Sequence, residues 1–514
     1  MRLDALLRDG LHLTGMPLPD LEVTSISADS RRVLPGSLFV AIRGETKDGH
    51  DFIGEAVRAG AAAIVAERFL PECSVPAIHV PDSRRALGLL AASWHGHPSR
   101  RLVLIGVTGT DGKTTTCHML LSILRAAGLR AGMITTVHAL LGDRSVDTGL
   151  HVTTPDAPEI QGLLAHLVEQ GASHCVLEVT SHGLAQERVA GCEFDIAVLT
   201  NITHEHLDYH RSFEVYRSVK GRLFAELGSA RRKQVAVGPL AVLNRDDASY
   251  EYVRGLTSVG NISYGLSEAA DVVGGEIEEG REGVGFIACG PGFEIPVRLP
   301  VLGRYNAPNA LAALTAAVAG LGVPAEVAGQ GLAEMGPVPG RMELIECGQE
   351  FTAIVDFAHT PNSLKAALGT ARRLAERKVI VLCGSAGMRD RTKRRRMAET
   401  AISLADEIVF TAEDPRSESL EAILAEMAEG ARDRGGIEGS TFWVLPDRPE
   451  ALRLAVSRAG RGDVVIACGK GHEQSMCFGD VEYPWDDRTA MRSAIAEKLG
   501  VPGAKMPRLP TSRR

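Results

Sequence analysis

The sequence lacks three features, and each absence argues against a class of protein. Its nine cysteines are scattered with no C-x-x-C pair, which argues against a zinc ribbon or a disulfide framework and fits a reducing compartment. No apolar run approaches the ~20 residues of a membrane helix, and the N-terminus lacks the apolar core of a signal peptide. A basic excess is also missing, since the formal net charge is −8, which argues against nucleic acid as the main partner. We therefore expect a cytoplasmic protein that binds neither nucleic acid nor membrane.

The chain is too long for one hydrophobic core. Its 514 residues, 45% hydrophobic and 23% charged, predict about three globular domains. A basic, proline-marked stretch precedes the apolar run at 102–107, and glycine and proline punctuate residues 336–340. We place the domain boundaries near residues 100 and 340. The expected fold class is α/β, with a small N-terminal α/β domain (1–100), a central domain around a mostly parallel sheet (101–340), a C-terminal Rossmann-like α/β domain (341–500) and a flexible tail (501–514).

The C-terminal block shows a regular alternation of strand-like and helix-like segments. Its four strand-like runs are "FTAIVD", "KVIVLCG", "EIVFTA" and "DVVIACG". This spacing predicts a parallel sheet with crossover helices. Each run ends in a polar cluster, and in open α/β sheets ligands bind beyond the carboxyl ends of the strands. The four clusters therefore predict a binding face.

The stretch "GVTGTDGKTTT" at 106–116 is similar to a phosphate-binding loop but lacks one of its glycines. The pattern G-x-x-x-x-G-K-[ST] places a glycine five residues before Gly112, where this chain has Val107. The stretch nevertheless follows a strand-like run and opens a helix-like one, so N–H groups and the helix dipole would face an anion. We expect a P-loop-type ATPase domain in which Lys113 reaches the outer phosphates and Thr114 holds Mg²⁺. The alternative is a glycine turn that only caps a helix.

A metal bound to phosphates needs further oxygen ligands. Glu178 ends a strand-like run and is a candidate carboxylate for Mg²⁺. The loop after the next strand-like run holds His206, Asp208 and His210, and its histidines could instead bind a transition metal or be solvated. Lys220 follows on a helix-like segment. Because an unmodified lysine cannot ligate Mg²⁺, its residue type alone predicts an ion-paired or surface side chain.

An ordered set of motifs resembles the Mur ligase family, ATP-dependent enzymes that extend the peptide of the cell-wall precursor. The motifs, in chain order, are "GTDGKTT", "TTPD", "EVTSHGL", "TNITHEHLDYH", "LGRYNAPNALAA", "GRME" and "DFAHTP". Together they span nearly the whole chain. Within the family, "TTPD", "EVTSHGLAQERV" and "GKGHE" are similar to the branch of the UDP-N-acetylmuramoyl-tripeptide synthetases, which join a diamino acid to UDP-MurNAc-L-Ala-D-Glu.

The resemblance implies a reaction and a binding role for each domain. A substrate carboxylate is first phosphorylated by ATP, and the amine of the amino acid then attacks the acyl phosphate. The N-terminal domain would bind UDP-MurNAc, the central domain ATP with Mg²⁺, and the C-terminal domain the amino acid. We expect a monomer acting on these small molecules.

The resemblance also assigns residues to ATP and metal, position by position. The catalytic set would be Lys113, Glu178, His206 and Lys220. Thr114 and Glu178 would hold one Mg²⁺ and His206 a second, while Lys220 matches a carbamylated lysine, whose anionic oxygens can lie near metal. The residues that would bind ATP are Gly109, Thr110, Asp111, Gly112, Lys113, Thr114, Thr115, Asn306, Asn309, Arg341, Asp356 and His359.

Three further groups of residues match substrate contacts. The uridine side would be bound by Ser30, Glu45, Thr46 and Lys47. The muramoyl-dipeptide would be bound by Thr153, Thr154, Thr180, Gln186 and Arg188. The amino acid would be bound by Arg389, Glu413, Asp414, Pro415, Arg416, Gly469 and Glu473.

The amino-acid motif departs from the pattern of the branch. Enzymes that use meso-diaminopimelate typically carry Asp-Asn-Pro-Arg where this chain has "EDPR". Arg389 and Arg416 could each clamp a carboxylate. Asp414, however, replaces a neutral amide with an anion, which would suit the bare ammonium of lysine or ornithine. The sequence leaves meso-diaminopimelate, L-lysine and L-ornithine open.

Two other functions remain open at this stage. One is a different Mur-type ligase, such as a folylpolyglutamate synthetase or another step of the same pathway. The other is an ATPase or binding module that hydrolyses ATP without ligation.

Overall fold

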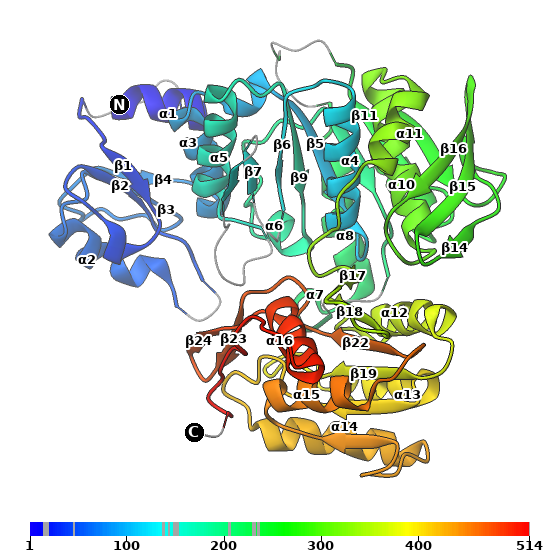
Figure 1. Cartoon of the computed structure of the whole chain (residues 1–514). Coiled ribbons are helices and arrows are strands. Elements are labelled where there is room, and N and C mark those ends of the chain that lie inside the picture. Colours follow the sequence, from blue (N-terminus) through cyan, green and yellow to red (C-terminus); the bar gives the residue numbers. More distant parts are fainter. Residues whose placement is uncertain are drawn as a thin grey trace. The chain divides into compact units, whose positions relative to one another are not determined.

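The computed structural model describes residues 1–13, 20–44, 47–135, 139–141, 144–146, 154–203, 207–228, 233 and 237–512 (Figure 1). The chain divides into two compact units. The first unit comprises Met1–His204, Ser212–Tyr264 and Thr315–Pro324, and the second Glu205–Arg211, Gly265–Leu314 and Ala325–Arg514. No helix in the described ranges is both long enough and apolar enough to cross a membrane.

The first unit begins with a small α/β layer. Its four strands pair in parallel in the order β1-β2-β3-β4. Apolar side chains of α1 and α3, including Leu6 and Leu90, share a core with Leu38 and Val65 of the sheet. The elements are α1 (Leu3–Leu11), β1 (Ser25–Ser27), β2 (Ser37–Val40), α2 (Ile53–Arg58), β3 (Ala63–Ala66), β4 (Ala77–His79) and α3 (Ser83–Trp94).

A larger, mostly parallel sheet follows in the first unit. Its order is β12-β11-β10-β5-β9-β6-β7-β8, parallel from β12 to β6 and antiparallel beyond. Its strands are β5 (Val103–Thr108), β6 (Ala131–Ile134), β7 (Ala139–Leu141), β8 (Arg144–Val146), β9 (His174–Glu178), β10 (Ile196–Leu199), β11 (Leu240–Asn244) and β12 (Gly260–Gly265). Strand β5 is buried along its whole length, as expected for a parallel strand covered on both faces.

Helices cover this sheet. Helix α4 contacts β5, β6 and β9, while α5 and α8 share a core with Leu104, Leu177 and Leu199. The helices are α4 (Lys113–Ala126), α5 (Ala157–Glu169), α6 (Ser181–Ala185), α8 (Phe213–Ala225) and α9 (Tyr250–Leu256). The mostly parallel central sheet predicted from the sequence is confirmed.

The second unit includes an antiparallel layer. Strand β15 pairs with β13, β14 and β16. Along β16, Ile295, Val297 and Leu299 are buried and alternate with exposed residues, so one face of the layer packs inward, with α11 against β16. The elements are α7 (Leu207–His210), β13 (Val272–Gly274), β14 (Glu278–Gly280), β15 (Gly283–Gly290), β16 (Phe293–Leu299), α10 (Asn306–Thr315) and α11 (Ala325–Ala333).

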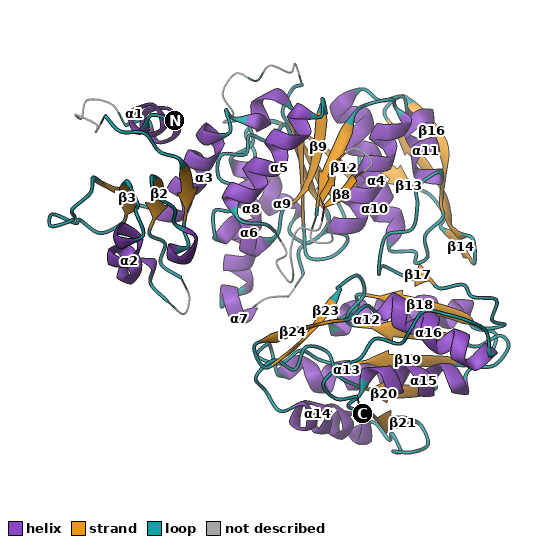
Figure 2. Cartoon of the chain, turned by 60° about the vertical axis from the view of Figure 1, so that its left-hand side comes forward, coloured by secondary structure: helices purple, strands orange, loops and turns teal. Residues whose placement is uncertain are grey.

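The rest of the second unit is the Rossmann-like sheet that the sequence predicted. Its order is β17-β18-β22-β19-β20-β21, parallel except at β17, and helices flank its strands (Figure 2). The four strand-like runs are β18 (Thr352–Asp356), β19 (Val379–Cys383), β20 (Glu407–Phe410) and β22 (Val464–Cys468). The other elements are β17 (Glu343–Leu344), α12 (Pro361–Leu374), α13 (Thr392–Leu404), α14 (Leu420–Asp433), β21 (Phe442–Val444), α15 (Arg448–Arg458), β23 (Ser475–Phe478), β24 (Val481–Pro484) and α16 (Asp487–Leu499).

The segment after α16 was expected to be a flexible tail, but its later described residues, 506–512, contact this domain. Leu509 is buried in the domain core, and the partly buried Met506 packs against that core. Thr511 Oγ1 and Ser512 Oγ donate to Asp447 Oδ2 at 3.0 and 2.7 Å. Asp447 also caps the N-terminus of α15. Two apolar side chains and two hydroxyls therefore hold a segment whose composition alone predicted fraying.

Candidate functional site

The loop between β5 and α4 requires glycine at two positions. At Gly109, with φ +151°, a Cβ would lie 1.8 Å from Thr200 Oγ1. Gly112, with φ +82°, stands in the left-handed region directly before α4. These two glycines allow the close approach and the turn that the loop needs, so the missing glycine at Val107 does not prevent a phosphate-binding shape.

The segment that follows β10 anchors this loop. Thr110 N donates to Asn201 O at 2.7 Å, and Asp111 N donates to Asn201 Oδ1 at 2.9 Å. Thr200 Oγ1 donates in turn to Asp111 O at 2.7 Å. We did not predict these roles, although "TNIT" was part of the motif set. The available signal was its place directly after a strand-like run, because β10 is the parallel neighbour of β5.

The start of α4 is suited to an anion. The first N–H groups of a helix have no acceptor within the helix and carry the positive end of its dipole. Lys113, the first residue of α4, folds back so that its Nζ donates to Thr110 O at 2.7 Å. The loop thus combines helix N–H groups with a cation, as expected for binding phosphate.

Thr114 and Glu178 meet beside the loop. Thr114 Oγ1 donates to Glu178 Oε2 at 2.8 Å, and both residues are only 3% exposed. The parallel register pairs Val107 with Glu178, which brings the carboxylate to the same sheet edge as the loop. A hydroxyl and a carboxylate are hard oxygen donors, so this pair fits Mg²⁺. The described residues contain no cluster of three or more His, Cys, Asp or Glu arranged to hold a metal.

Lys220 lies under the loop. Its Nζ donates to Gly109 O at 2.6 Å and lies 4.8 Å from the centroid of the Tyr216 ring. Tyr216 OH is hydrogen-bonded to Thr110 Oγ1 at 3.0 Å. Lys220 is 1% exposed, which excludes the surface alternative that its residue type suggested. His206 lies outside the described residues.

The residues predicted to contact the muramoyl-dipeptide form one cluster in the first unit. The hydroxyls of Thr154 and Thr180 are hydrogen-bonded at 2.8 Å. Arg188 Nη1 donates to Thr154 O, and its Nη2 donates to Gln186 Oε1 at 2.7 Å. Thr180 is also the N-cap of α6, where it accepts from Gly183 N. Thr153 lies outside the described residues.

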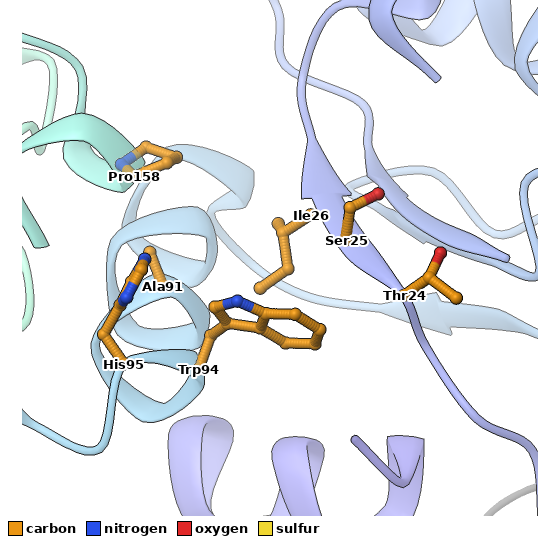
Figure 3. Close-up of a pocket in the computed structure, with 7 residues that line it drawn as sticks. All are labelled: Thr24, Ser25, Ile26, Ala91, Trp94, His95 and Pro158. Atoms are coloured by element: carbon orange, nitrogen blue, oxygen red, sulfur yellow. The ribbon is translucent and has the colours of Figure 1, made fainter. Parts of the chain in front are cut away.

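The predicted uridine contacts are less fully described. Ser30 begins the short helix Ser30–Arg32, and Lys47 O accepts from Gly44 N at 2.9 Å. Glu45 and Thr46 lie outside the described residues. A separate cavity of about 180 Å³ opens between β1, α3 and α5 (Figure 3), and none of the predicted site residues lines it. Its lining residues are Thr24, Ser25, Ile26, Ala91, Trp94, His95 and Pro158.

The predicted nucleotide contacts of the second unit form two groups. At the start of α10, Asn309 Nδ2 donates to Asn306 Oδ1 at 3.0 Å, and both asparagines are buried. At the end of β18, Asp356 accepts from the backbone N of Met342 and Ala358. Burial raises the pKa of the Asp356 carboxyl, while nearby Arg341 opposes that rise.

Aromatic contacts orient the second of these groups. The guanidinium of Arg341 lies 4.4 Å from the centroid of the Phe357 ring. The His359 ring is 4.6 Å from the same ring between centroids, and His359 Nδ1 donates to Phe357 O. Phe357 was not predicted as a site residue, although its ring contacts both Arg341 and His359, which were predicted.

The predicted amino-acid residues lie on three neighbouring strand ends. The loops after β19 and β20 are joined by a hydrogen bond from Gly387 N to Asp414 O at 2.9 Å. The loops after β20 and β22 are joined by Lys470 Nζ, which donates to both carboxylate oxygens of Asp414 at 2.8 Å. Arg389 is exposed, whereas Pro415 is buried and Arg416 and Glu473 are half-buried. The residues predicted for this face therefore lie together at the carboxyl ends of neighbouring strands.

Glu413 is the most deeply enclosed acid of this face. It is 4% exposed, and its Oε2 has no hydrogen-bond partner among the described residues. A Cβ on Gly469 would lie 2.2 Å from that oxygen. Burial raises the pKa of Glu413 to about 7, against the opposing effect of Lys393.

Family models match most of the chain. The Mur ligase family catalytic domain matches residues 22–95, the Mur ligase middle domain 107–317, and the Mur ligase glutamate ligase domain 340–471. The three matched ranges follow the order of the three domains expected from the sequence.

Individual proteins are similar over nearly the whole length. The UDP-N-acetylmuramoyl-L-alanyl-D-glutamate--2,6-diaminopimelate ligase of Geobacillus thermodenitrificans is 44% identical, over 95% of this chain and 97% of that protein. The UDP-N-acetylmuramyl-tripeptide synthetase of Roseiflexus sp. is 42% identical, over 98% of this chain and 100% of that protein. A solved structure of a UDP-N-acetylmuramoyl-L-alanyl-D-glutamate--2,6-diaminopimelate ligase matches with a TM-score of 0.67 and 29% identity, over 97% of this chain and 100% of that one. The chain therefore belongs to the Mur ligase family of ATP-dependent amide-forming ligases, in its UDP-N-acetylmuramoyl-tripeptide synthetase branch.

Proposed function

We propose that this protein joins meso-diaminopimelate to UDP-MurNAc-L-Ala-D-Glu in peptidoglycan precursor synthesis. The observation that carries the proposal is the glycine-rich loop before α4, in which Lys113 starts the helix and the buried Thr114 donates to Glu178. The similarity of the whole chain to 2,6-diaminopimelate ligases supports the choice of substrate. We further propose that the protein acts in the cytoplasm and as a monomer.

The proposed reaction has two steps. In the first, an oxygen of the D-Glu γ-carboxylate bonds to the γ-phosphorus of ATP, the bond from that phosphorus to the β,γ-bridging oxygen breaks, and ADP leaves. In the second, the neutral amine of the diamino acid bonds to the acyl carbon, inorganic phosphate leaves with the electron pair of the C–O bond, and the nitrogen loses a proton. The carboxylate must be activated because its own oxygen is a poor leaving group.

The phosphate loop serves the first step by offsetting charge. Two anions approach each other when the carboxylate attacks ATP, so fixed positive charge lowers the barrier. Lys113 and the N–H groups at the start of α4 supply that charge. Thr114 and Glu178 would hold Mg²⁺, which adds further positive charge beside the phosphates. The second metal at His206 remains a prediction.

Lys220 is proposed to be carbamylated. In that modification the Nζ ammonium first gives up one proton, and the neutral nitrogen then bonds to the carbon of CO₂ and loses a second proton, which leaves an anionic carbamate. The support in this chain is the burial of Lys220 beside the phosphate loop, where an ordinary surface lysine would not lie.

The remaining contacts are proposed by position. Ser30, Glu45, Thr46 and Lys47 would bind the uridine side, and the cluster around Thr154 and Arg188 the muramoyl-dipeptide. Asn306, Asn309, Arg341, Asp356 and His359 would contact the nucleotide. Arg389 and Arg416 would bind carboxylate groups of the diamino acid, since a guanidinium can bind a carboxylate in two-pronged fashion.

A coupled assay tests the function. Purified protein receives UDP-MurNAc-L-Ala-D-Glu, ATP and Mg²⁺, with meso-diaminopimelate, L-lysine or L-ornithine in parallel. We expect phosphate release and a tripeptide product by mass spectrometry only with meso-diaminopimelate. Phosphate release that ignores the amino acid would support an ATPase without ligation. The folylpolyglutamate synthase of Mycobacterium tuberculosis, 17% identical with a TM-score of 0.60, shares the fold, so folate with glutamate is the appropriate negative control.

A further inference from the structure

Asp414 joins the loops of the amino-acid face to one another. Its backbone oxygen accepts from Gly387 N in the loop after β19. Its carboxylate accepts from Lys470 in the loop after β22, and its Oδ1 also accepts from Cys477 N in the hairpin β23–β24, at 2.9 Å. Asp414, in the loop after β20, is thus hydrogen-bonded to three other segments of the chain.

The charge of Asp414 is balanced inside the protein. Asp414 is 6% exposed and Lys470 is fully buried, and Lys470 Nζ also pairs with Glu473. Burial by itself would lower the pKa of Lys470, but Glu473 and Asp414 together raise it, so the lysine stays charged. A buried carboxylate that binds a buried ammonium through both oxygens has its charge offset before any substrate arrives.

The backbone of Asp414 also indicates a structural role. Its φ is +41°, in the left-handed region that aspartate tolerates better than most residues. Nearby Arg416 has φ +53°, and its N donates to Cys477 O at 3.1 Å. The turn that presents the Arg416 side chain is therefore set by bonds to the hairpin as well as by Asp414.

A second buried cation, Arg448, binds backbone oxygens at the bases of the loops after β20 and β22. Arg448 is fully buried, and it binds both carboxylate oxygens of Asp487 at 2.7 and 2.6 Å. Its remaining donors bind Ala412 O at 3.0 Å and Cys468 O at 2.9 Å, the residues directly before Glu413 and Gly469. The loops after β20 and β22 are thus fixed at their bases by Arg448 and across their tips by Lys470.

We infer that Asp414 and Lys470 form an internal lock that positions the amino-acid loops, and that Asp414 does not bind an ammonium group of the substrate. This inference rests on the proposed function. It changes the interpretation of "EDPR", because both carboxylate oxygens of the anion that would suit lysine or ornithine already accept from Lys470. A diamino acid with a carboxylate at its far end then meets Arg416 without a competing free aspartate.

Variants at position 414 separate positioning from substrate contact. Asp414→Asn keeps one acceptor, Oδ1, which can still serve Lys470 and Cys477 N but gives up the second contact to Lys470, whereas Asp414→Ala removes both acceptors. We expect kcat/KM for meso-diaminopimelate to fall by about 5-fold or less in Asp414→Asn and by about 50-fold or more in Asp414→Ala, with the KM for ATP unchanged in both. If Asp414 instead binds the substrate ammonium, Asp414→Asn would raise the KM for the diamino acid as much as Asp414→Ala does, and the inference would be overturned.

Variants at Lys470 test the pair itself. Lys470→Met leaves a buried carboxylate without its counter-charge, so we expect kcat/KM to fall by about 100-fold and the melting temperature to drop. In the double variant Asp414→Asn, Lys470→Met, at least about 10-fold of activity and part of the melting temperature should return. Additive losses in the double variant would contradict the lock. Lys365→Met, at an exposed lysine of α12, is the matched control.

The melting temperatures separate the two proposals. They report the coupling between Asp414 and Lys470 without any substrate. A wild-type protein that ligates no diamino acid would refute the proposed function, while the coupling in melting temperature would still decide whether the lock exists. Ligation by the wild type with no coupling would refute the lock alone.

Discussion

Thr114 Oγ1 and Glu178 Oε2 lie 2.8 Å apart in a buried position beside the phosphate loop. The two side chains are 64 residues apart in sequence and meet because β5 and β9 are parallel neighbours.

Removing the Thr114 hydroxyl should disable the first step. We expect Thr114→Ala to lower kcat for phosphate release by about 100-fold or more, because one oxygen donor for Mg²⁺ is lost beside developing charge. Thr114→Ser retains the hydroxyl and should keep most of the activity. The measurement is phosphate release at increasing Mg²⁺, and wild-type rates in Thr114→Ala would refute the metal assignment.

A methyl group at Gly109 should distort the loop. The added Cβ would lie 1.8 Å from Thr200 Oγ1, so either the loop or the 200–201 segment must move. We expect Gly109→Ala to lose most ATP affinity in calorimetry and about 1–3 kcal/mol of stability. Gly255→Ala is the control, since that glycine of α9 has open space around it and alanine favours helix. Equal ATP affinity in both variants would show that the loop does not need glycine.

Carbamylated Lys220 should be required for activity. We expect Lys220→Ala to be nearly inactive and to regain part of its activity in acetate or another small carboxylic acid, which can replace the carbamate oxygens. Lys220→Arg should stay inactive under the same conditions, because a guanidinium is not carbamylated and cannot be an anion. The readouts are rescue of phosphate release and a carbamate carbon signal with ¹³C-labelled CO₂. Full activity of Lys220→Ala without additive would contradict the role.

The sequence predicted those parts of the fold and site that depend on local patterns. Apolar runs followed by polar clusters located β18, β19, β20 and β22, and the glycines located the turn between β5 and α4. These signals are local because strand burial and tight turns act on a few consecutive residues.

The parts that could not be predicted depend on contacts between distant segments. Asn201 binds Asp111 across 90 residues of sequence, and Lys470 binds Asp414 across 56. The residue types at these positions allow many partners, and only the strand order selects one. For the same reason, the sequence indicated that the Asp414 carboxylate was available to bind a substrate ammonium. Leu509 was likewise assigned to a tail and not to the core.

Arg448 should be required for the shape of the amino-acid face. Arg448→Met leaves Asp487 buried without its cation and frees the carbonyls of Ala412 and Cys468, so we expect a loss of about 3–5 kcal/mol in unfolding free energy. Asp487→Asn should cost less, because its amide oxygen can still accept from Arg448 Nε and from Trp485 Nε1, and only the contact of Arg448 Nη2 is lost. Denaturant unfolding checks both. A loss below 1 kcal/mol in Arg448→Met would contradict the clamp.

Glu413 should make stability depend on pH. Its pKa is about 7 in the folded protein, above the value of 4.5 for an exposed glutamate, because its carboxyl is buried. Below pH 4.5 the group is protonated in both states and contributes no pH dependence. Between about 4.5 and 7 the folded protein holds a proton that the unfolded chain releases, so stability should fall as the pH rises, by on the order of 3 kcal/mol in total.

Glu413→Gln mimics the neutral carboxyl and should remove this part of the pH dependence. Urea unfolding of both proteins at several pH values between 5 and 8 measures it, and identical pH profiles would show that Glu413 titrates like an exposed acid.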